Sequence, residues 1–168
     1  MLGLAAVLTA AARFASATAE ERAQGGDRVT ATRIVAAILA ARPPAQVTHV
    51  RCERINGHRA CGIVVDGVKF KRLLTLAAWN AEITGLVERA FASAPDLEEV
   101  DCWAVVPLDA GRGVIVSGDY AKPTSATVFS ITVPRVRRGR TAARLRESGT
   151  DVFWDPAFRT SLAKGTRG

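Results

Sequence analysis

The chain has 168 residues, of which 48% are hydrophobic and 23% are charged, and its formal net charge is +7. This composition excludes an intrinsically disordered chain, and the length predicts a single domain with tails. Only four of the 23 basic residues are lysines, whereas 19 are arginines. A coding sequence rich in G and C also produces such an excess, so the net charge alone does not indicate nucleic-acid binding. Residues 93–134 are net acidic, and residues 135–168 are net basic.

The first segment of the chain has the pattern of a secretory signal peptide. Residues 2–12 are apolar, a run too short for a transmembrane helix of roughly 20 residues. Small residues follow, with cleavage patterns that end at Ala17 and at Ala19, although no basic residue precedes the apolar run. We therefore predict a signal peptide over 1–19 and an exported bacterial protein, periplasmic or extracellular, without a membrane span in its mature chain. A cytoplasmic location is the alternative.

The next segments predict a linker and a helix. Residues 20–29 are polar, contain two consecutive glycines and indicate a linker. Residues 30–41 have an apolar face with helical spacing. Thr30 or Thr32 is expected to cap this helix, and Pro43 and Pro44 are expected to end it.

A hairpin signal follows at Asn56-Gly57, because both residues tolerate the positive φ of a type I′ turn. A two-residue turn places Cys52 directly opposite Cys61, at a non-hydrogen-bonded pair whose Cα atoms are about 4.5 Å apart. In an exported protein this pair would oxidise, so we expect a Cys52–Cys61 disulfide. Two buried thiols are the alternative.

The rest of the chain predicts two meanders and a long helix. A second turn at Asp66-Gly67 would pair Phe70 with Ile63 and create a third strand, unless a helix already begins at residue 69. Residues 76–91 predict the main helix, and 100–106, 113–117 and 126–133 predict three more strands. Residues 141–146 predict a short basic helix. The aromatic residues Phe153, Trp154 and Phe158 are expected to pack back onto the domain.

These elements predict an α+β fold. The expected architecture is a two-layer sandwich, with an antiparallel sheet built from two meanders and helices on one face. The α+β domain would span residues 30–134, and a basic C-terminal extension, 135–168, would pack back on it.

No motif for catalysis, a cofactor or a metal occurs in the chain. Cys102 is the third cysteine, and a catalytic cysteine needs a nearby histidine. The chain has two, His49 and His58. We therefore predict no catalytic residue, no cofactor and no metal site.

Two polar segments are candidate binding sites. The loop 117–125 carries Asp119, Tyr120, Lys122 and Thr124. The arginine run comprises Arg135, Arg137, Arg138, Arg140, Arg144 and Arg146. The resulting expectation is a non-catalytic exported domain that binds a partner protein or an anionic surface. One alternative is a cytosolic protein that binds nucleic acid through 135–146, and another is a small enzyme of unknown reaction. The sequence does not set the oligomeric state.

Overall fold

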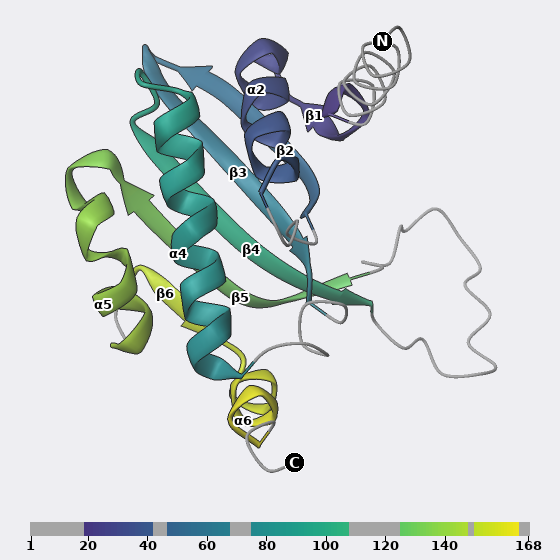
Figure 1. Ribbon diagram of the computed structural model, residues 1–168, viewed down its shortest axis with the longest axis vertical. Helices are drawn as coiled ribbons and strands as arrows, with labels where there is room; N and C mark the ends of the chain where they lie inside the picture. The colour runs from purple at the N-terminus through teal and green to yellow at the C-terminus, as the bar shows by residue number, and fades with distance from the viewer. Residues whose placement is uncertain (1–18, 42–46, 68–74, 108–124, 148–149, 165–168) are drawn as a thin grey trace, which may run out of the picture.

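The structure is a computed structural model that describes residues 19–41, 47–67, 75–107, 125–147 and 150–164. The elements in chain order are β1 (Ala23–Gln24), α2 (Arg28–Leu39), β2 (Val47–Ile55), β3 (His58–Asp66), α4 (Leu76–Ser93), β4 (Glu99–Pro107), β5 (Ser125–Pro134), the 3-10 helix η1 (Arg135–Arg140), α5 (Thr141–Arg146), β6 (Val152–Trp154) and α6 (Pro156–Lys164) (Figure 1). Helices and a single sheet confirm the predicted α+β class.

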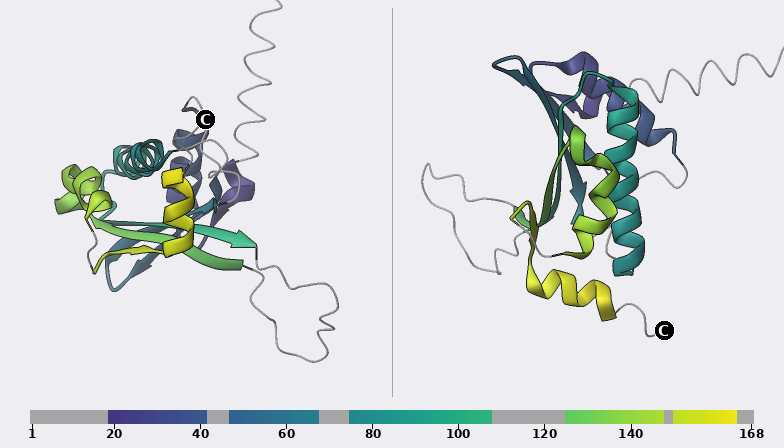
Figure 2. Two further views of the ribbon diagram at one scale, coloured as in Figure 1. Left: turned by 90° about the horizontal axis from the view of Figure 1, so that it is seen from below. Right: turned by 90° about the vertical axis from the view of Figure 1, so that its left-hand side faces the viewer.

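The six strands form one mixed sheet in the order β1-β2-β3-β4-β5-β6. The pairs β2–β3, β4–β5 and β5–β6 are antiparallel, whereas β1–β2 and β3–β4 are parallel. Figure 2 shows α2, α4 and α5 on one face of this sheet, with the opposite face left without a helix. The two residues of β1 lie within the segment interpreted as a linker, and they pair with Val50 and Arg51 of β2.

The expectation of an all-antiparallel sheet built from two meanders is wrong. β4 lies beside β3 and runs parallel to it along Ala60–Asp66, the edge that a strand after Asp66-Gly67 would have occupied. Parallel neighbours need a crossover connection, and α4 is that connection. β4 and β5 also pair directly with each other. Phe70 and the strand predicted over 113–117 lie outside the described residues.

The β2–β3 hairpin has the predicted register. Asn56 and Gly57 have φ angles of 52° and 83°, as a type I′ turn requires. Ile55 pairs with His58 across the turn, and Cys52 pairs with Cys61. The local turn chemistry therefore fixed which residues face each other along the whole hairpin.

The two long helices begin at side-chain caps. α2 starts at Arg28 rather than at residue 30, because the Thr30 backbone N–H donates to the Asp27 carboxylate at 3.1 Å. The predicted caps Thr30 and Thr32 are thus helical residues, and Asp27 is the N-cap. α4 begins after Thr75, whose hydroxyl accepts from the Ala78 N–H at 3.2 Å. Both helices bury an apolar stripe against the sheet.

An aromatic cluster joins the C-terminal segment to the core. The Trp79 ring of α4 lies edge-on to Phe129 of β5 and to Phe158 of α6, with centroid separations of 5.6 and 5.2 Å. Trp154 of β6 packs on Phe129 at 4.6 Å. Phe153 instead points away and is 49% exposed. Two of the three aromatic residues in the tail thus pack on the domain.

Among the described residues, no helix combines the length and apolarity needed to cross a bilayer. The predicted basic helix has the observed bounds of α5, Thr141–Arg146. Its Leu145 is buried, and its Thr141 hydroxyl donates to the Arg138 carbonyl at 2.6 Å.

Candidate functional site at the hairpin end of the sheet

One end of the sheet gathers the β2–β3 turn, the start of β4 and the start of η1 (Figure 1). We call it the hairpin end and define it as residues 54–58, 96–98 and 135–140. Backbone hydrogen bonds tie these segments together: the Glu98 N–H donates to the Arg59 carbonyl at 2.9 Å, and the Arg135 N–H donates to the Glu98 carbonyl at 2.7 Å. Arg135, the first residue of the arginine run, is therefore bonded directly to the residue that precedes β4.

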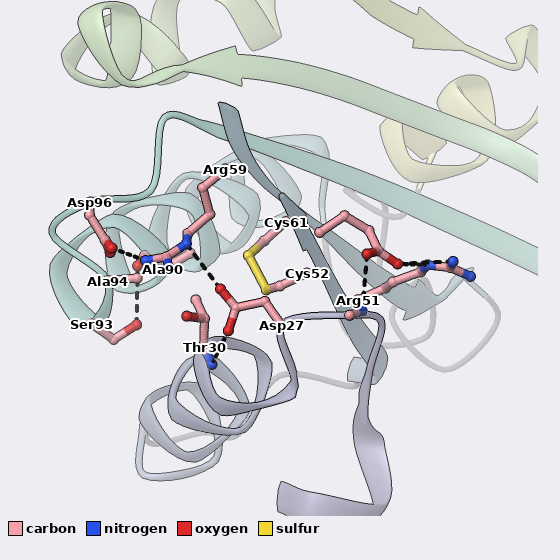
Figure 3. The surroundings of a disulfide bond; sticks show 12 residues. Asp27, Thr30, Arg51, Cys52, Arg59, Cys61, Ala90, Ser93, Ala94 and Asp96 are labelled. Atoms are coloured by element: carbon pink, nitrogen blue, oxygen red, sulfur yellow. Dashed lines mark hydrogen bonds and ion pairs between the residues drawn. A yellow bond between two sulfur atoms is a disulfide. The ribbon is translucent and has the colours of Figure 1, made fainter. Parts of the chain in front are cut away.

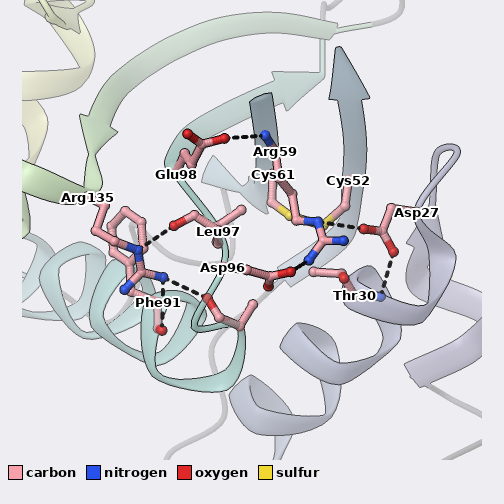
Figure 4. A network of polar contacts seen from close by, with 11 residues as sticks. Asp27, Thr30, Cys52, Arg59, Cys61, Phe91, Asp96, Leu97, Glu98 and Arg135 are labelled. Carbon is pink, nitrogen blue, oxygen red and sulfur yellow. Dashed lines mark hydrogen bonds and ion pairs between the residues drawn. A yellow bond between two sulfur atoms is a disulfide. The ribbon is translucent and has the colours of Figure 1, made fainter. Parts of the chain in front are cut away.

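Arg135 holds the end of α4 rather than facing a partner (Figure 4). Its guanidinium donates to the carbonyls of Leu97 at 2.5 Å and Ala94 at 2.7 Å, and more weakly to that of Phe91 at 3.4 Å. The same group lies 4.7 Å from the centre of the Phe91 ring. The last carbonyls of a helix have no partner within it, so Arg135 serves as a C-terminal cap.

Two further arginines of the run contact Asp151. The Arg144 guanidinium donates to the Thr132 carbonyl at 3.0 Å and to the Asp151 carboxylate at 2.5 Å. Arg137 lies 3.6 Å from the same carboxylate, but its side chain is 59% exposed. Arg144 thus fastens α5 to the edge of the sheet, and Arg137 is only loosely paired.

Besides Arg137, three arginines of the run are exposed: Arg138, Arg140 and Arg146. Within the described part of the chain, none of them has a carboxylate within ion-pair distance. Arg138 and Arg140 belong to η1 at the hairpin end, and Arg146 ends α5. The arginine run therefore divides into two groups. Arg135 and Arg144 hold elements of the fold together, whereas the other arginines are exposed to solvent.

Exposed aliphatic side chains accompany these arginines at the hairpin end. Val136 is 92% exposed in η1, and Ile55 is 63% exposed beside the hairpin turn. Sequence reasoning named the arginines of the run and overlooked both aliphatic residues. For Val136 the available signal was an aliphatic residue between two arginines, two positions after the proline that ends a strand.

The carboxylates at this end are already paired. Arg59 contacts Asp27 at 2.9 Å and also contacts Asp96, so it joins the start of α2 to the segment after α4 (Figures 3 and 4). Burial raises the pKa of Asp27, but the hydrogen bonds from Thr30 and the charge of Arg59 outweigh it, so the net pKa is below the ordinary value. Glu98 accepts from the Arg59 N–H at 2.9 Å. Arg138 and Arg140 of η1, which have no carboxylate partner among the described residues, therefore add positive charge to this end.

The disulfide lies directly beneath this network (Figure 3). Cys52 and Cys61 are joined with an S–S distance of 2.02 Å and a Cα–Cα distance of 4.2 Å. Both are buried on the face that the helices cover. The bond cross-links the two strands that present the hairpin turn, so it restrains the position of Ile55.

No protein-family model, curated protein or solved structure matches the chain. Its function is therefore inferred from side-chain chemistry alone.

Cysteine catalysis finds no support at Cys102. The residue is fully buried, and burial followed by the charge of Asp101 raises the pKa of its thiol far above the ordinary value. A thiol in this state does not provide the thiolate that attacks a substrate. His58 lies 3.4 Å from Glu98, and His49 has a pKa lowered by burial and by Arg51. Among the described residues, no group of three or more His, Cys, Asp or Glu side chains is placed to hold a metal ion.

The sheet face without helices carries a second polar feature. The Thr132 hydroxyl donates to the Asp101 carboxylate at 2.5 Å, and burial raises the pKa of Asp101 despite this bond. Trp103 lies over Gly62, where an added Cβ would come within 2.2 Å of the indole. Alternation along β4 places Asp101 and Trp103 on the same face of the sheet.

Two hollows are lined by described residues, and neither has a catalytic arrangement. One of about 190 Å³ is lined by Arg144, Glu147, Thr150, Asp151 and Val152. Within this hollow, the Arg144 guanidinium already donates to the Asp151 carboxylate. The other, of about 430 Å³, lies at the start of α2 and is lined by Glu20, Arg28, Val29 and Thr32.

Several predicted site residues lie outside the described residues. These are the loop candidates Asp119, Tyr120, Lys122 and Thr124, and the cleavage candidate Ala17. The other cleavage candidate, Ala19, is fully buried against the core.

Proposed function

We propose that this chain is a non-catalytic domain that binds an anionic, phosphate-bearing surface through Arg138, Arg140 and Arg146. The observation that carries the proposal is the exposure of these three guanidiniums without a carboxylate in ion-pair distance. Arginine presents a planar fork of N–H donors that matches phosphate oxygens. Two consecutive short elements, η1 and α5, carry these exposed side chains, an arrangement suited to an extended charged surface.

The test compares two triple variants of the full chain with the same change in net charge. One is Arg138→Ala, Arg140→Ala and Arg146→Ala. The matched control replaces Arg28, Arg33 and Arg51, which are exposed on α2 and β2, by Ala. Binding to inorganic polyphosphate is measured by titration at several salt concentrations.

The wild type should bind polyphosphate with an affinity that falls as salt rises, because bound arginines release counterions. The first triple variant should bind at least tenfold more weakly and with a shallower salt dependence, whereas the control should bind like the wild type. Equal losses in the two variants would show that only net charge matters and would refute the proposal. Duplex DNA bound far more tightly than polyphosphate of the same charge would instead favour the nucleic-acid alternative.

We further propose that the protein is exported. The buried Cys52–Cys61 bond supports this location, because disulfides persist in oxidising compartments. Intact mass after fractionation of native cells tests it: a mature chain beginning at Thr18 or Glu20, lighter by two hydrogen atoms, is expected. A full-length cytosolic chain with three free thiols would overturn it.

A further inference from the structure

We infer that the surface bound by the hairpin end is the interface of an anionic lipid bilayer, into which Val136 and Ile55 insert. This inference rests on the proposed binding of an anionic surface and names the kind of surface. Two of the four large, exposed hydrophobic residues of the described chain lie at this one end, beside unpaired arginines. The other two, Val29 and Phe153, lie on α2 and β6.

The exposure of these two residues has no role in the fold. Val136 is the most exposed large hydrophobic side chain, at 92%, although its neighbour Arg135 is fixed by bonds to the end of α4. Ile55 is held outward by the hydrogen-bonded pair with His58 and by the type I′ turn. Rigid backbone on both sides thus presents aliphatic groups to water, which is unfavourable unless a partner covers them.

The charges at this end favour anionic lipid. The carboxylates there contact groups of the protein: Asp96 pairs with Arg59, and Glu98 accepts a hydrogen bond from the Arg59 N–H and lies 3.4 Å from His58. The hairpin end contains five arginines and two carboxylates, so it meets a negative headgroup layer with an excess of positive charge. Arginine side chains reach headgroup phosphates while their aliphatic stems and neighbouring apolar groups enter the boundary of the acyl chains.

The shape of this end favours a deformable planar surface over a folded protein or a nucleic acid. The hairpin turn and η1 lie at one end of the sheet (Figures 1 and 2), and the two hollows described above, lined by residues 20–32 and 144–152, lie elsewhere. The strand positions between them, β3 and β4, set a lateral separation of about 14 Å, from three strand spacings. Two protruding aliphatic contacts at that spacing fit one bilayer surface, whereas the phosphate-lined surface of a polyanion such as DNA offers no continuous apolar layer to them.

The experiment measures partition of the full, oxidised chain into vesicles of phosphatidylglycerol and phosphatidylcholine, with vesicles of phosphatidylcholine alone as reference. The double variant Ile55→Ser and Val136→Ser tests the inference. The matched control, Val29→Ser and Phe153→Ser, also removes two exposed apolar side chains. Polyphosphate binding of each variant is measured in parallel, since it depends on the arginines alone.

The wild type should partition into the anionic vesicles only. The test variant should partition at least tenfold more weakly, and the control should partition like the wild type. Val136→Leu should strengthen partition about fourfold, the value of one added methylene group. Polyphosphate binding should be unchanged in all of them.

Unchanged vesicle binding of the test variant would overturn the inference while the proposed function stands. So would an equal loss in the control variant, or binding of the wild type to polyphosphate without binding to vesicles. Absence of binding to both probes would refute the proposed function itself.

Discussion

Replacing Arg135 by Ala should destabilise the fold, whereas replacing Arg138, three residues away, should not. Arg135 donates two short hydrogen bonds, to the carbonyls of Leu97 and Ala94, and stacks over the Phe91 ring. Hydrogen bonds from a charged donor contribute about 1.5–3 kcal/mol each, and a cation over an aromatic ring about 0.5–1 kcal/mol. Partial solvent screening and replacement by water reduce the total, so we expect a loss of about 2–4 kcal/mol.

The assay is urea unfolding of each variant, followed by circular dichroism and by tryptophan fluorescence. Arg138→Ala should stay within about 0.5 kcal/mol of the wild type, as surface substitutions usually do. The free energy of unfolding of Arg135→Lys should lie between those of Arg135→Ala and Arg138→Ala. The lysine ammonium keeps the charge but lacks the planar fork of N–H donors that spans two carbonyls. A loss below about 0.5 kcal/mol for Arg135→Ala would refute its role as the C-terminal cap of α4.

Three other predictions address the disulfide and the open face of the sheet. Replacing Cys52 and Cys61 together by Ala should lower the free energy of unfolding by about 2–3 kcal/mol, the value expected for a bond that closes a short loop. Urea unfolding with and without reductant measures this loss. Gly62→Ala should displace Trp103, cost about 1–3 kcal/mol and shift the tryptophan emission to longer wavelength; an unchanged spectrum would contradict the observed packing. Asp101 has a pKa raised by burial, so the folded chain takes up a proton before the unfolded chain does. The stability of the wild type relative to Asp101→Asn should therefore rise as pH falls from above the raised pKa towards 3.8, and a constant difference would contradict burial of the charge.

Local signals predicted local structure well. Asn56-Gly57 set the hairpin register and the facing of Cys52 and Cys61. The spacing of apolar residues predicted α4, and α5 has the predicted bounds. Both helices depend on residues that lie only a few positions apart in the sequence. The start of α2 was misplaced because several residues there can cap a helix, and only the structure shows that Asp27 does.

Long-range pairing was not predictable in the same way. Asp66-Gly67 has the composition of a hairpin turn, yet β3 pairs with β4 across the whole of α4. No local pattern distinguishes a turn that returns beside its strand from one that leads into a crossover helix.

The functional division of the arginine run was equally hidden. Arg135 and Arg138 are the same residue type in one charged segment. They differ in their surroundings: the Arg135 guanidinium reaches the carbonyls at the end of α4, whereas Arg138 is exposed on η1.

The short separation of the two bonded cysteines also bears on the order of folding. Cys52 and Cys61 belong to one hairpin, which can form within microseconds as an independent unit. Cys102 reaches its place beside Ile63 only after the chain has closed the much longer connection through α4. An oxidant acting on the emerging chain would thus find the correct pair together before the third thiol arrives, and the topology itself protects against mispaired sulfur.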